Sequence, residues 1–513
     1  MSQHVVVIDF PGIKEFVFAT DTLREIQGAS ALLDAFNRDE LVERIRRHLP
    51  RATAVEEVYA NGGGGQLVLE AGGADEQRLD EGLVRVACDV DEVFAGGIAL
   101  VYGLARLDGQ GYKAAVAAAH RDLRRRRWAA PVRAAVATAP LVRECASLGA
   151  RPARVCANVA GIARPEGGDD VRWVSELTRR KLAKAHEIRR PGAAHSHLWS
   201  AFEDAVGWPP CDTLDEVGEL SSGRHGYIGV VYADGNSMGK VVQDIPDKES
   251  YRAFSRIVDD SVREASYEVI REHDLQALPL LLGGDDVVMV LPASAALRFA
   301  AELPEAFQRR SGRAVAKDGT PWLREKCRHG FSISVGVAVG RARHPFHLLF
   351  DQAEQLLHSA KKDAARTTGA SDPRTQARVD FQIVKSSMVR EVTEARKTEF
   401  VFDGPAKGNT GSFLRTLRPY EPAKLKTLLE LASNLRQGKF PNSKAAALAG
   451  AAMAPTRRAA EFRAIEVLAH LKDSHRGLLE DAVDELCGGG LPPFGSGAGT
   501  FFTELYECYQ LVR

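Results

Sequence analysis

The hydrophobic and polar positions in the middle of the chain alternate between the period of strands and the period of helices. Residues 226–234, "GYIGVVYAD", form an apolar run typical of a buried strand, and "KESYRAFSRIVDDSVREASYEVIREH" then places apolar residues three and four apart, as an amphipathic helix does. The run "LPLLLGGDDVVMVLP", residues 278–292, predicts two strands joined by a tight turn at Gly283 and Gly284. A second helix, the strand "FSISVGVAVG" and a last helix, "HLLFDQAEQLLHSAKKDAAR", complete the pattern. The order βαββαβ plus one helix is ferredoxin-like.

The N-terminal part of the chain shows the same order of elements with different residues. "HVVVIDF" predicts a strand, "TLREIQGASALLDAFNRDELVERIRRHL" a helix, and "TAVEEVYANGGGGQLVLEA" a hairpin whose turn, residues 62–65, is all glycine. A helix, the strand "IALVYGLARL" and a basic helix follow. Since "GGGG" stands where the later unit has "GGDD", we interpret the chain as an internal duplication in which one copy lacks the carboxylates.

The remaining stretches separate and follow these two units. Residues 131–222 are rich in Arg, Pro and Gly with weak periodicity, which predicts a linker region. Beyond residue 385, three helical patterns with Pro and Gly breaks predict a small bundle. We therefore expect a first unit over 1–130, the linker over 131–222, a second unit over 223–385 and a helical domain over 386–513.

Composition narrows the class of protein. Among 513 residues, Lys+Arg and Asp+Glu both number 68, so a net charge of zero argues against a protein that coats nucleic acid. The densest basic run, "RDLRRRRW", suits either an RNA backbone or a solvated helix face. No apolar run is long enough for a membrane helix, and "MSQHVVVIDF" is not a secretory signal. Seven scattered cysteines fit a reducing compartment, so a cytoplasmic protein without a membrane partner is expected.

Three aspartates carry the candidate chemistry. Asp234 ends the first strand of the second unit, and Asp285 and Asp286 occupy its hairpin. A βαββαβ sheet brings that strand end beside the hairpin, where three carboxylates repel one another and raise a pKa unless a cation joins them. Mg²⁺ or Mn²⁺ prefers such oxygen ligands together with substrate phosphates, so the pattern predicts a two-metal site. The alternative is that Asp285 and Asp286 are ordinary turn residues without a functional role.

The segment after Asp234 predicts a phosphate site. It places glycines and a serine at a strand-to-helix junction, where main-chain N–H groups can cradle phosphates. Lys361, on the last helix of the unit, is a second cation that could reach a triphosphate, although a solvated helix face is the alternative for the lysines. The nucleotide-binding candidates of this unit are Gly235, Asn236, Ser237, Met238, Gly239, Lys240, Gly283, Gly284 and Lys361.

These motifs resemble a known family. "YADGNSMGK", "LLLGGDDVVMVLP", "FSISVGVAVG" and "AEQLLHSAKK" are similar to the catalytic palm domain of the polymerase/cyclase large subunit of type III CRISPR effector complexes, and more distantly to GGDEF diguanylate cyclases. "IDFPGIKEFVFATDTLREIQGASALL" resembles the first, non-catalytic palm of that family. The resemblance covers both units.

The resemblance implies synthesis of cyclic oligoadenylates from ATP when the complex binds foreign RNA. It implies that Asp234, Asp285 and Asp286 hold the metals and act in catalysis, and that the segment 235–240 holds the donor triphosphate. The glycine turn, through Gly63 and Gly64, is implied to form a second nucleotide pocket. ATP, RNA and other effector subunits are the implied partners.

The chain departs from the family pattern in three places. It begins at the first palm, without the HD nuclease domain of many members, so a reduced form is expected. Asn236 stands where a second acidic residue is common. The inter-palm zinc finger of the family uses paired CxxC motifs, whereas this linker offers Cys145, Cys156 and Cys211 and no CxxC, so zinc is not expected.

We therefore predict an α+β fold with two ferredoxin-like palm domains, an inter-palm linker and a C-terminal helical bundle. The predicted function is a nucleotidyltransferase that makes cyclic oligoadenylates from ATP. One alternative is a nucleotide- or RNA-binding scaffold of a ribonucleoprotein without turnover. Another is a GGDEF-like cyclic dinucleotide synthase that uses GTP.

Overall fold

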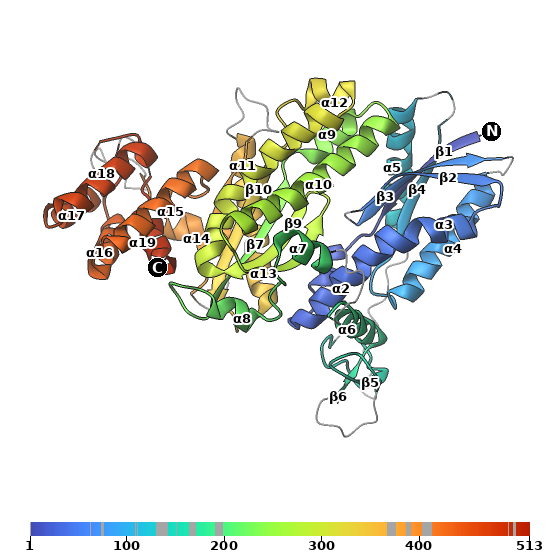
Figure 1. The fold of residues 1–513 in the computed structure, drawn as a ribbon, viewed down its shortest axis with the longest axis horizontal. Coiled ribbons are helices and arrows are strands. Elements are labelled where there is room, and N and C mark those ends of the chain that lie inside the picture. The colour runs from blue at the N-terminus through green and yellow to red at the C-terminus, as the bar shows by residue number, and fades with distance from the viewer. Residues whose placement is uncertain are drawn as a thin grey trace.

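The computed structural model describes residues 2–512, apart from 62, 73–75, 108, 110, 130–141, 150, 164–170, 190–197, 367–375, 386–390, 403–412, 491 and 496–498. Two sheets with their helices lie next to each other, and a helical region follows at the far end of the chain (Figure 1). The predicted α+β class and the helical C-terminal region are confirmed.

The first sheet has four antiparallel strands in the order β2-β3-β1-β4. Val6 and Ile8 of β1 face the main core, whereas Val5 and Val7 face helix α5, because successive side chains of a strand point to opposite faces. The elements of this unit are β1 (Ser2–Asp9), α1 (Ile13–Val17), α2 (Leu23–Ala35), the π-helix η1 (Phe36–Glu40), α3 (Leu41–His48), β2 (Thr53–Asn61), β3 (Gly64–Ala71), α4 (Glu76–Val93), β4 (Val101–Arg106) and α5 (Tyr112–Ala129).

The second sheet repeats this order and adds one strand, giving β11-β10-β7-β9-β8. Strand β11 runs parallel to β10 and lies outside the predicted pattern, because its five residues are too few for a periodicity to stand out. The elements are β7 (Tyr227–Gly235), α9 (Met238–Asp244), α10 (Lys248–Glu272), β8 (Leu278–Gly283), β9 (Asp286–Pro292), α11 (Ala293–Asp318), α12 (Pro321–Lys326), β10 (Ile333–Arg341), α13 (Phe346–Arg366) and β11 (Val379–Ile383).

The predicted linker region contains a two-stranded hairpin and three helices within its described part. Gly28 of α2 lets α6 approach closely, because a Cβ there would lie 1.8 Å from the carbonyl oxygen of Lys181. The elements are β5 (Val155–Asn158), β6 (Val171–Val174), α6 (Glu176–Ile188), α7 (Trp199–Val206) and α8 (Leu214–Glu219).

The C-terminal region packs against the second unit, where buried Arg418 donates to the carbonyl oxygen of Phe381 on β11 at 3.0 Å. Arg418 also pairs with Glu504 at 3.1 Å and with Glu507 at 3.1 Å, so one buried cation serves two carboxylates. The elements are α14 (Val392–Glu399), β12 (Val401–Phe402), β13 (Phe413–Leu414), α15 (Pro422–Gln437), α16 (Asn442–Ala452), α17 (Arg457–Ala469), α18 (Asp473–Cys487) and α19 (Phe502–Leu511). Within the described residues, every helix is too short or too polar to cross a membrane.

Candidate active site

The sheet of the second unit brings the predicted aspartates to one edge. Asp234 on β7 lies opposite Asp286 on β9 in the antiparallel register, at the point where both strands meet the turn. The main-chain N–H of Gly235 donates to the carbonyl oxygen of Asp285 at 3.2 Å, which ties the strand end to the hairpin. The register thus brings Asp234 and Asp286 together, and the Gly235 bond holds Asp285 beside them.

Gly235 allows the Asp285 carboxylate to lie against the main chain. A Cβ at this position would come within 2.9 Å of Asp285 Oδ2 and 2.6 Å of Met238 Cε. Any side chain would displace the carboxylate or the methionine, since such contacts are closer than van der Waals distance. Gly235 thus positions an acidic residue, a role distinct from the predicted phosphate cradle.

The electrostatics of the three aspartates favour a bound cation. Burial raises the pKa of Asp285, and the negative charge of Asp234 raises it further against the opposing effect of Lys361. Burial also raises the pKa of Asp286, with Asp234 and Asp285 adding to the rise and Lys14 and Lys361 opposing it. Three carboxylates share two nearby lysines, so negative charge is in excess at this edge.

The donor set suits a hard divalent cation. All three side chains offer carboxylate oxygens, which Mg²⁺ and Mn²⁺ prefer. Their oxygens are not gathered as closely as at one other place in the described chain, where Glu272, His273 and Glu302 bring three ligand atoms within 4.8 Å of one another. Asp285 lines one cavity and Asp286 lines another, described below. The side chains of Asp234 and Asp285 lie within hydrogen-bond reach of each other, and the chemistry of the three residues fits the metal.

Lys361 lies at the aspartates, on helix α13. Its Nζ is 2.6 Å from Asp234 Oδ2 and donates to the carbonyl oxygen of Gly235 at 2.9 Å. The side chain is therefore fixed beside the acidic edge, which the sequence pattern alone could not distinguish from a solvated helix face. Lys240, by contrast, is exposed on α9 and lines neither cavity.

Asn236 has a structural role in the loop after β7. Its Nδ2 donates to Ser332 Oγ at 3.0 Å and to the carbonyl oxygen of Gln376 at 2.8 Å, and its main-chain N–H donates to the carbonyl oxygen of Ser332 at 2.8 Å. These bonds fix the loop that follows β7. In this chain the amide therefore holds the backbone that carries Asp234, and its contacts lead away from the acidic residues.

Asp259 of α10 holds the acidic turn, and sequence reasoning missed it. Its Oδ1 accepts from the N–H of Gly284 at 2.7 Å, and Gly284 has the positive φ of 62° that a tight turn requires. Its carboxylate also pairs with Arg263 at 3.2 Å and with Arg38 of the first unit at 3.7 Å. The only sequence signal was the spacing of Asp259 and Arg263, which is common on exposed helices.

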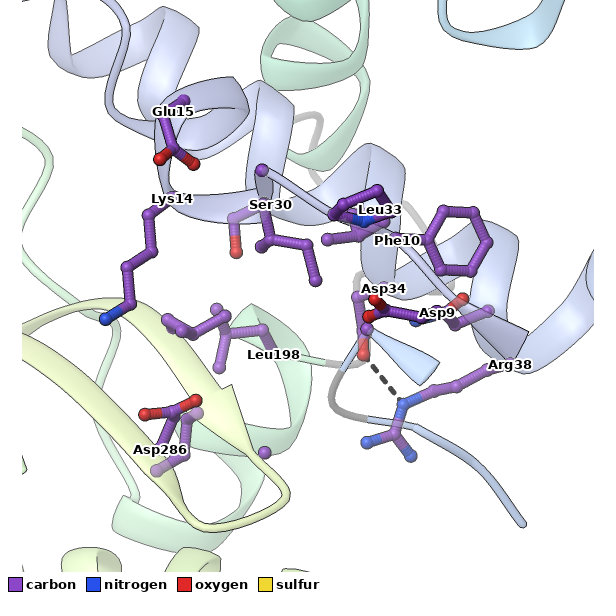
Figure 2. A pocket seen from close by; sticks show the side chains of 18 of the residues that line it. Asp9, Phe10, Lys14, Glu15, Ser30, Leu33, Asp34, Arg38, Leu198 and Asp286 are labelled. Carbon is purple, nitrogen blue, oxygen red and sulfur yellow. Dashed lines mark hydrogen bonds and ion pairs between the residues drawn. The ribbon is translucent and has the colours of Figure 1, made fainter. Parts of the chain in front are cut away.

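A first cavity of about 340 Å³ lies between the first unit and the acidic hairpin. Figure 2 shows Lys14 and Asp286 on one side of it and Asp34 with Arg38 on the other. Lys14 Nζ is 2.6 Å from Glu354 Oε1 of α13 and 4.9 Å from the centre of the Tyr232 ring. The volume is within the range of small-ligand sites. Lys14 is a second residue that sequence reasoning missed.

A second cavity of about 460 Å³ lies at the turn of the hairpin. Asp285, Gly239 and the predicted glycines Gly63 and Gly64 line it. Tyr59 and Tyr251 also line it, from the two different units, with ring centroids 5.1 Å apart and an interplanar angle of 7°. Met238, Gly284 and Asp9 line it as well. The two cavities thus flank the acidic turn, and each takes residues from both units.

The first unit contains a counterpart of the acidic strand end. Asp9 lies at the end of β1, as Asp234 does at the end of β7. Arg127 of α5 is 3.6 Å from Asp9, and Lys361 of α13 is 2.6 Å from Asp234. Burial raises the pKa of Asp9 and Arg127 lowers it only in part. Both units therefore pair a strand-end aspartate with a cation from the last helix.

The same correspondence holds inside both sheets. A Cβ on Gly103 of β4 would lie 1.9 Å from the carbonyl oxygen of Ala119, and one on Gly336 of β10 would lie 2.2 Å from that of Ala353. Each glycine therefore lets the last helix of its unit lie directly on the sheet. The two units share strand order, close helix approach and charge pairing, although their sequences differ.

A ferredoxin-like sheet with acidic residues at the central strand end and on the adjoining hairpin defines a palm domain. Residues 227–369 match the family model for the second palm domain of Cas10/Cmr2. The match spans the second unit from β7 through α13 and is confined to that part of the chain.

Solved structures share the fold along the whole chain. A crystal structure of a Csm1–Csm4 cassette in complex with cA4 matches with 14% identity and a TM-score of 0.57, covering 100% of this chain and 70% of that chain. The complex with pppApApA matches with 14% identity and a TM-score of 0.58, at the same coverage of 100% and 70%. Csm1 in T. onnurineus matches with 14% identity and a TM-score of 0.54, again over 100% and 70%. No curated protein matches the sequence.

Proposed function

We propose that the protein is a nucleotidyltransferase that joins ATP molecules into cyclic oligoadenylates. The 3′-hydroxyl of one ribose attacks the α-phosphate of another nucleotide, a new P–O bond forms, the bond between the α- and β-phosphates breaks, and pyrophosphate leaves. The single observation that carries the proposal is that the consecutive residues Asp285 and Asp286 line two different cavities, each of which also takes residues from the first unit. That arrangement suits two nucleotides whose reacting ends meet at the acidic edge.

Asp234, Asp285 and Asp286 are the residues that would hold Mg²⁺ or Mn²⁺. When bound, such ions lower the pKa of the attacking hydroxyl and stabilise charge on the departing pyrophosphate. The chain itself places Asp286 toward the first cavity and Asp285 toward the second, so a nucleotide in each would have a carboxylate at its reactive end. Lys361 orients Asp234 by its contact of 2.6 Å, and Lys14 offers a cation to phosphates in the first cavity.

The relatives of similar fold support the choice of adenylates and of a second palm. Csm1–Csm4 cassettes have been solved in complex with cA4, cA3 and AMPPNP. By this analogy the first unit, residues 1–130, is a non-catalytic palm, and 131–222, 223–385 and 386–513 are the linker, the catalytic palm and the helical domain. A companion subunit, RNA and a cytoplasmic location belong to the same proposal.

Product analysis tests the proposal. The pure full-length chain is incubated with each NTP and Mn²⁺, with and without single-stranded RNA, and products are identified by mass spectrometry. Cyclic or linear oligoadenylates that disappear in Asp285→Ala/Asp286→Ala would support ATP-dependent transfer. Products from GTP alone would favour a cyclic dinucleotide synthase.

A scaffold without turnover predicts a different result. It gives no product under any of these conditions and equal nucleotide binding in wild type and in Asp285→Ala/Asp286→Ala. Metal-dependent ATP binding that the double variant loses would instead indicate an enzyme that lacks its activator. An exposed, remote pair such as Asp473→Ala/Glu480→Ala on α18 serves as the matched control.

A further inference from the structure

The π-helix η1 lies against the first cavity. It interrupts the run between α2 and α3, and Asn37 and Arg38, both within it, line the cavity. Single π-helical turns inside α-helical runs often occur at functional sites, because they redirect side chains at a cost in helix stability. The distortion therefore singles out the residues that it turns toward the cavity.

Asn37 carries a buried side-chain oxygen without a partner. Its side chain is 3% exposed, and its Oδ1 is buried with no hydrogen bond to any described residue. Buried amides in folded proteins are almost always hydrogen-bonded, since an unpaired one loses its solvation without compensation. Its charged neighbour is satisfied, because Arg38 pairs with Asp34 at 2.8 Å and with Asp259 at 3.7 Å. Because Asn37 also lines the first cavity, this oxygen is a candidate acceptor for a ligand bound there.

The second unit shows that the fold does not require an amide at this place. Asp34 and Arg38 of the first unit correspond to Asp259 and Arg263 of α10, an ion pair of the same spacing, so Asn37 corresponds to Val262. Val262 is fully buried, and α10 stays α-helical through it. An apolar residue therefore suffices for packing, and the polar residue of the first unit needs another explanation.

We propose that Asn37 recognises the adenine base of the nucleotide in the first cavity. A carboxamide offers one acceptor and one donor, the complement of the adenine 6-amino group and its neighbouring ring nitrogen. Leu33, Leu198 and Leu281 line the cavity and supply apolar walls for the base, and Lys14 and Asp286 supply the charged groups for the phosphate end (Figure 2). This inference rests on the proposed function and names the residue that selects its substrate.

The experiment separates the amino group from the rest of the nucleotide. The α,β-methylene analogues of ATP and of purine riboside triphosphate, which lacks the 6-amino group, are titrated calorimetrically into the full chain with Mg²⁺. For wild type we expect about tenfold weaker binding of the analogue without the amino group at one of the two sites, the loss of one well-made hydrogen bond. In Asn37→Leu the two analogues should bind that site equally.

Matched variants keep the result interpretable. Asn434→Leu makes the same change at an exposed position of α15 and should retain the wild-type difference between the analogues. If Asn37→Leu does not fold by thermal unfolding, Asn37→Val introduces the residue found at the corresponding place of the second unit.

The outcomes distinguish this inference from the proposed function. Binding of the ATP analogue with no dependence on the amino group in wild type would overturn the role of Asn37 and leave the proposed function standing. An equal loss for both analogues in Asn37→Leu would also overturn it. If wild type binds neither analogue, both the inference and the proposed function fall.

Discussion

The two ferredoxin-like units differ most at one hairpin. In the second, Asp286 lies opposite Asp234 in the register, whereas in the first the residue opposite Asp9 is Gly64. The residue before it is Asp285 in one unit and Gly63 in the other. The strand end keeps its aspartate in both units, so the acidic pair of the hairpin is what separates them.

The conformation of the two turns explains why glycine occupies the first. Gly63 has φ of 79°, and a Cβ there would lie 1.8 Å from Ile13 Cδ1. In the second turn the positive φ falls one place earlier, at Gly284, and Asp285 is left in an ordinary conformation. A left-handed backbone disfavours most side chains, so the first hairpin could not simply accept an aspartate at this position. One unit thus supplies cavity walls, and the other supplies the acidic groups.

The largest expected effect comes from neutralising the strand-end aspartates one at a time. Asp234→Asn should lower turnover by on the order of 10³-fold, because it removes a carboxylate shared by both nucleotide sites. Asp9→Asn should lower it by about tenfold at most, since only a wall contact is lost. Pyrophosphate release measures both, with thermal unfolding to verify the fold. Equal losses would contradict the division of roles between the units.

A pair of glycines tests the close packing at the acidic edge. Gly235→Ala should lower the free energy of unfolding by about 1–3 kcal/mol, because the new methyl group overlaps Met238 and Asp285. Gly239→Ala, four residues along and with nothing within 4 Å of its Cβ, should raise it by about 0.5–1 kcal/mol within a helix. Urea denaturation of both variants checks the difference, and a neutral Gly235→Ala would show that the edge is loosely packed.

The contacts of Asp259, which supports the acidic turn, can be compared with those of Asp34, its counterpart in the first unit. Asp259→Ala should cost about 2–3 kcal/mol, because it leaves the Gly284 N–H and Arg263 without their acceptor and removes the longer of the two ion pairs of Arg38. Asp34→Ala removes an i,i+4 pair with Arg38 and should cost about 0.5 kcal/mol. Chemical denaturation gives both values. A cost for Asp34→Ala that matched Asp259→Ala would mean that both helices support the turn equally.

These contrasts also indicate what sequence patterns can and cannot predict. Strand and helix periods predict the second sheet because these signals are local, although the turn lies at Gly284 and Asp285, one residue later than predicted, and Gly283 ends β8. The aspartates follow from them because the topology places a strand end beside a hairpin. Sequence patterns do not predict the roles of Asp259, Lys14 and Asn37, since each acts through contacts with residues far away in the chain.

The register corrects one detail of the predicted duplication. Reading "GGGG" against "GGDD" letter by letter pairs Gly65 with Asp286, whereas the strand register pairs Gly64 with it. The difference of one residue cannot be seen in the sequence because every residue of the first turn is glycine. Pairing across a sheet decides which residue takes the place of an acidic one.

The last expected effect is a dependence of stability on pH. The pKa of Asp286 is raised in the folded protein, so above the ordinary carboxyl pKa the folded state holds a proton that the unfolded chain has lost. The free energy of unfolding therefore falls as pH rises from the ordinary carboxyl pKa to the raised pKa of the folded protein. Asp286→Asn should therefore be more stable than wild type by about 1–2 kcal/mol at pH 8, with the difference disappearing near pH 4. Asp9→Asn should gain less, since Arg127 already offsets the burial of Asp9. Thermal unfolding at both pH values measures the difference, and Mg²⁺ should reduce it at pH 8 by stabilising wild type alone. A variant less stable than wild type at pH 8 would mean that the carboxylate is well compensated and that the acidic edge has no excess charge for a cation to relieve.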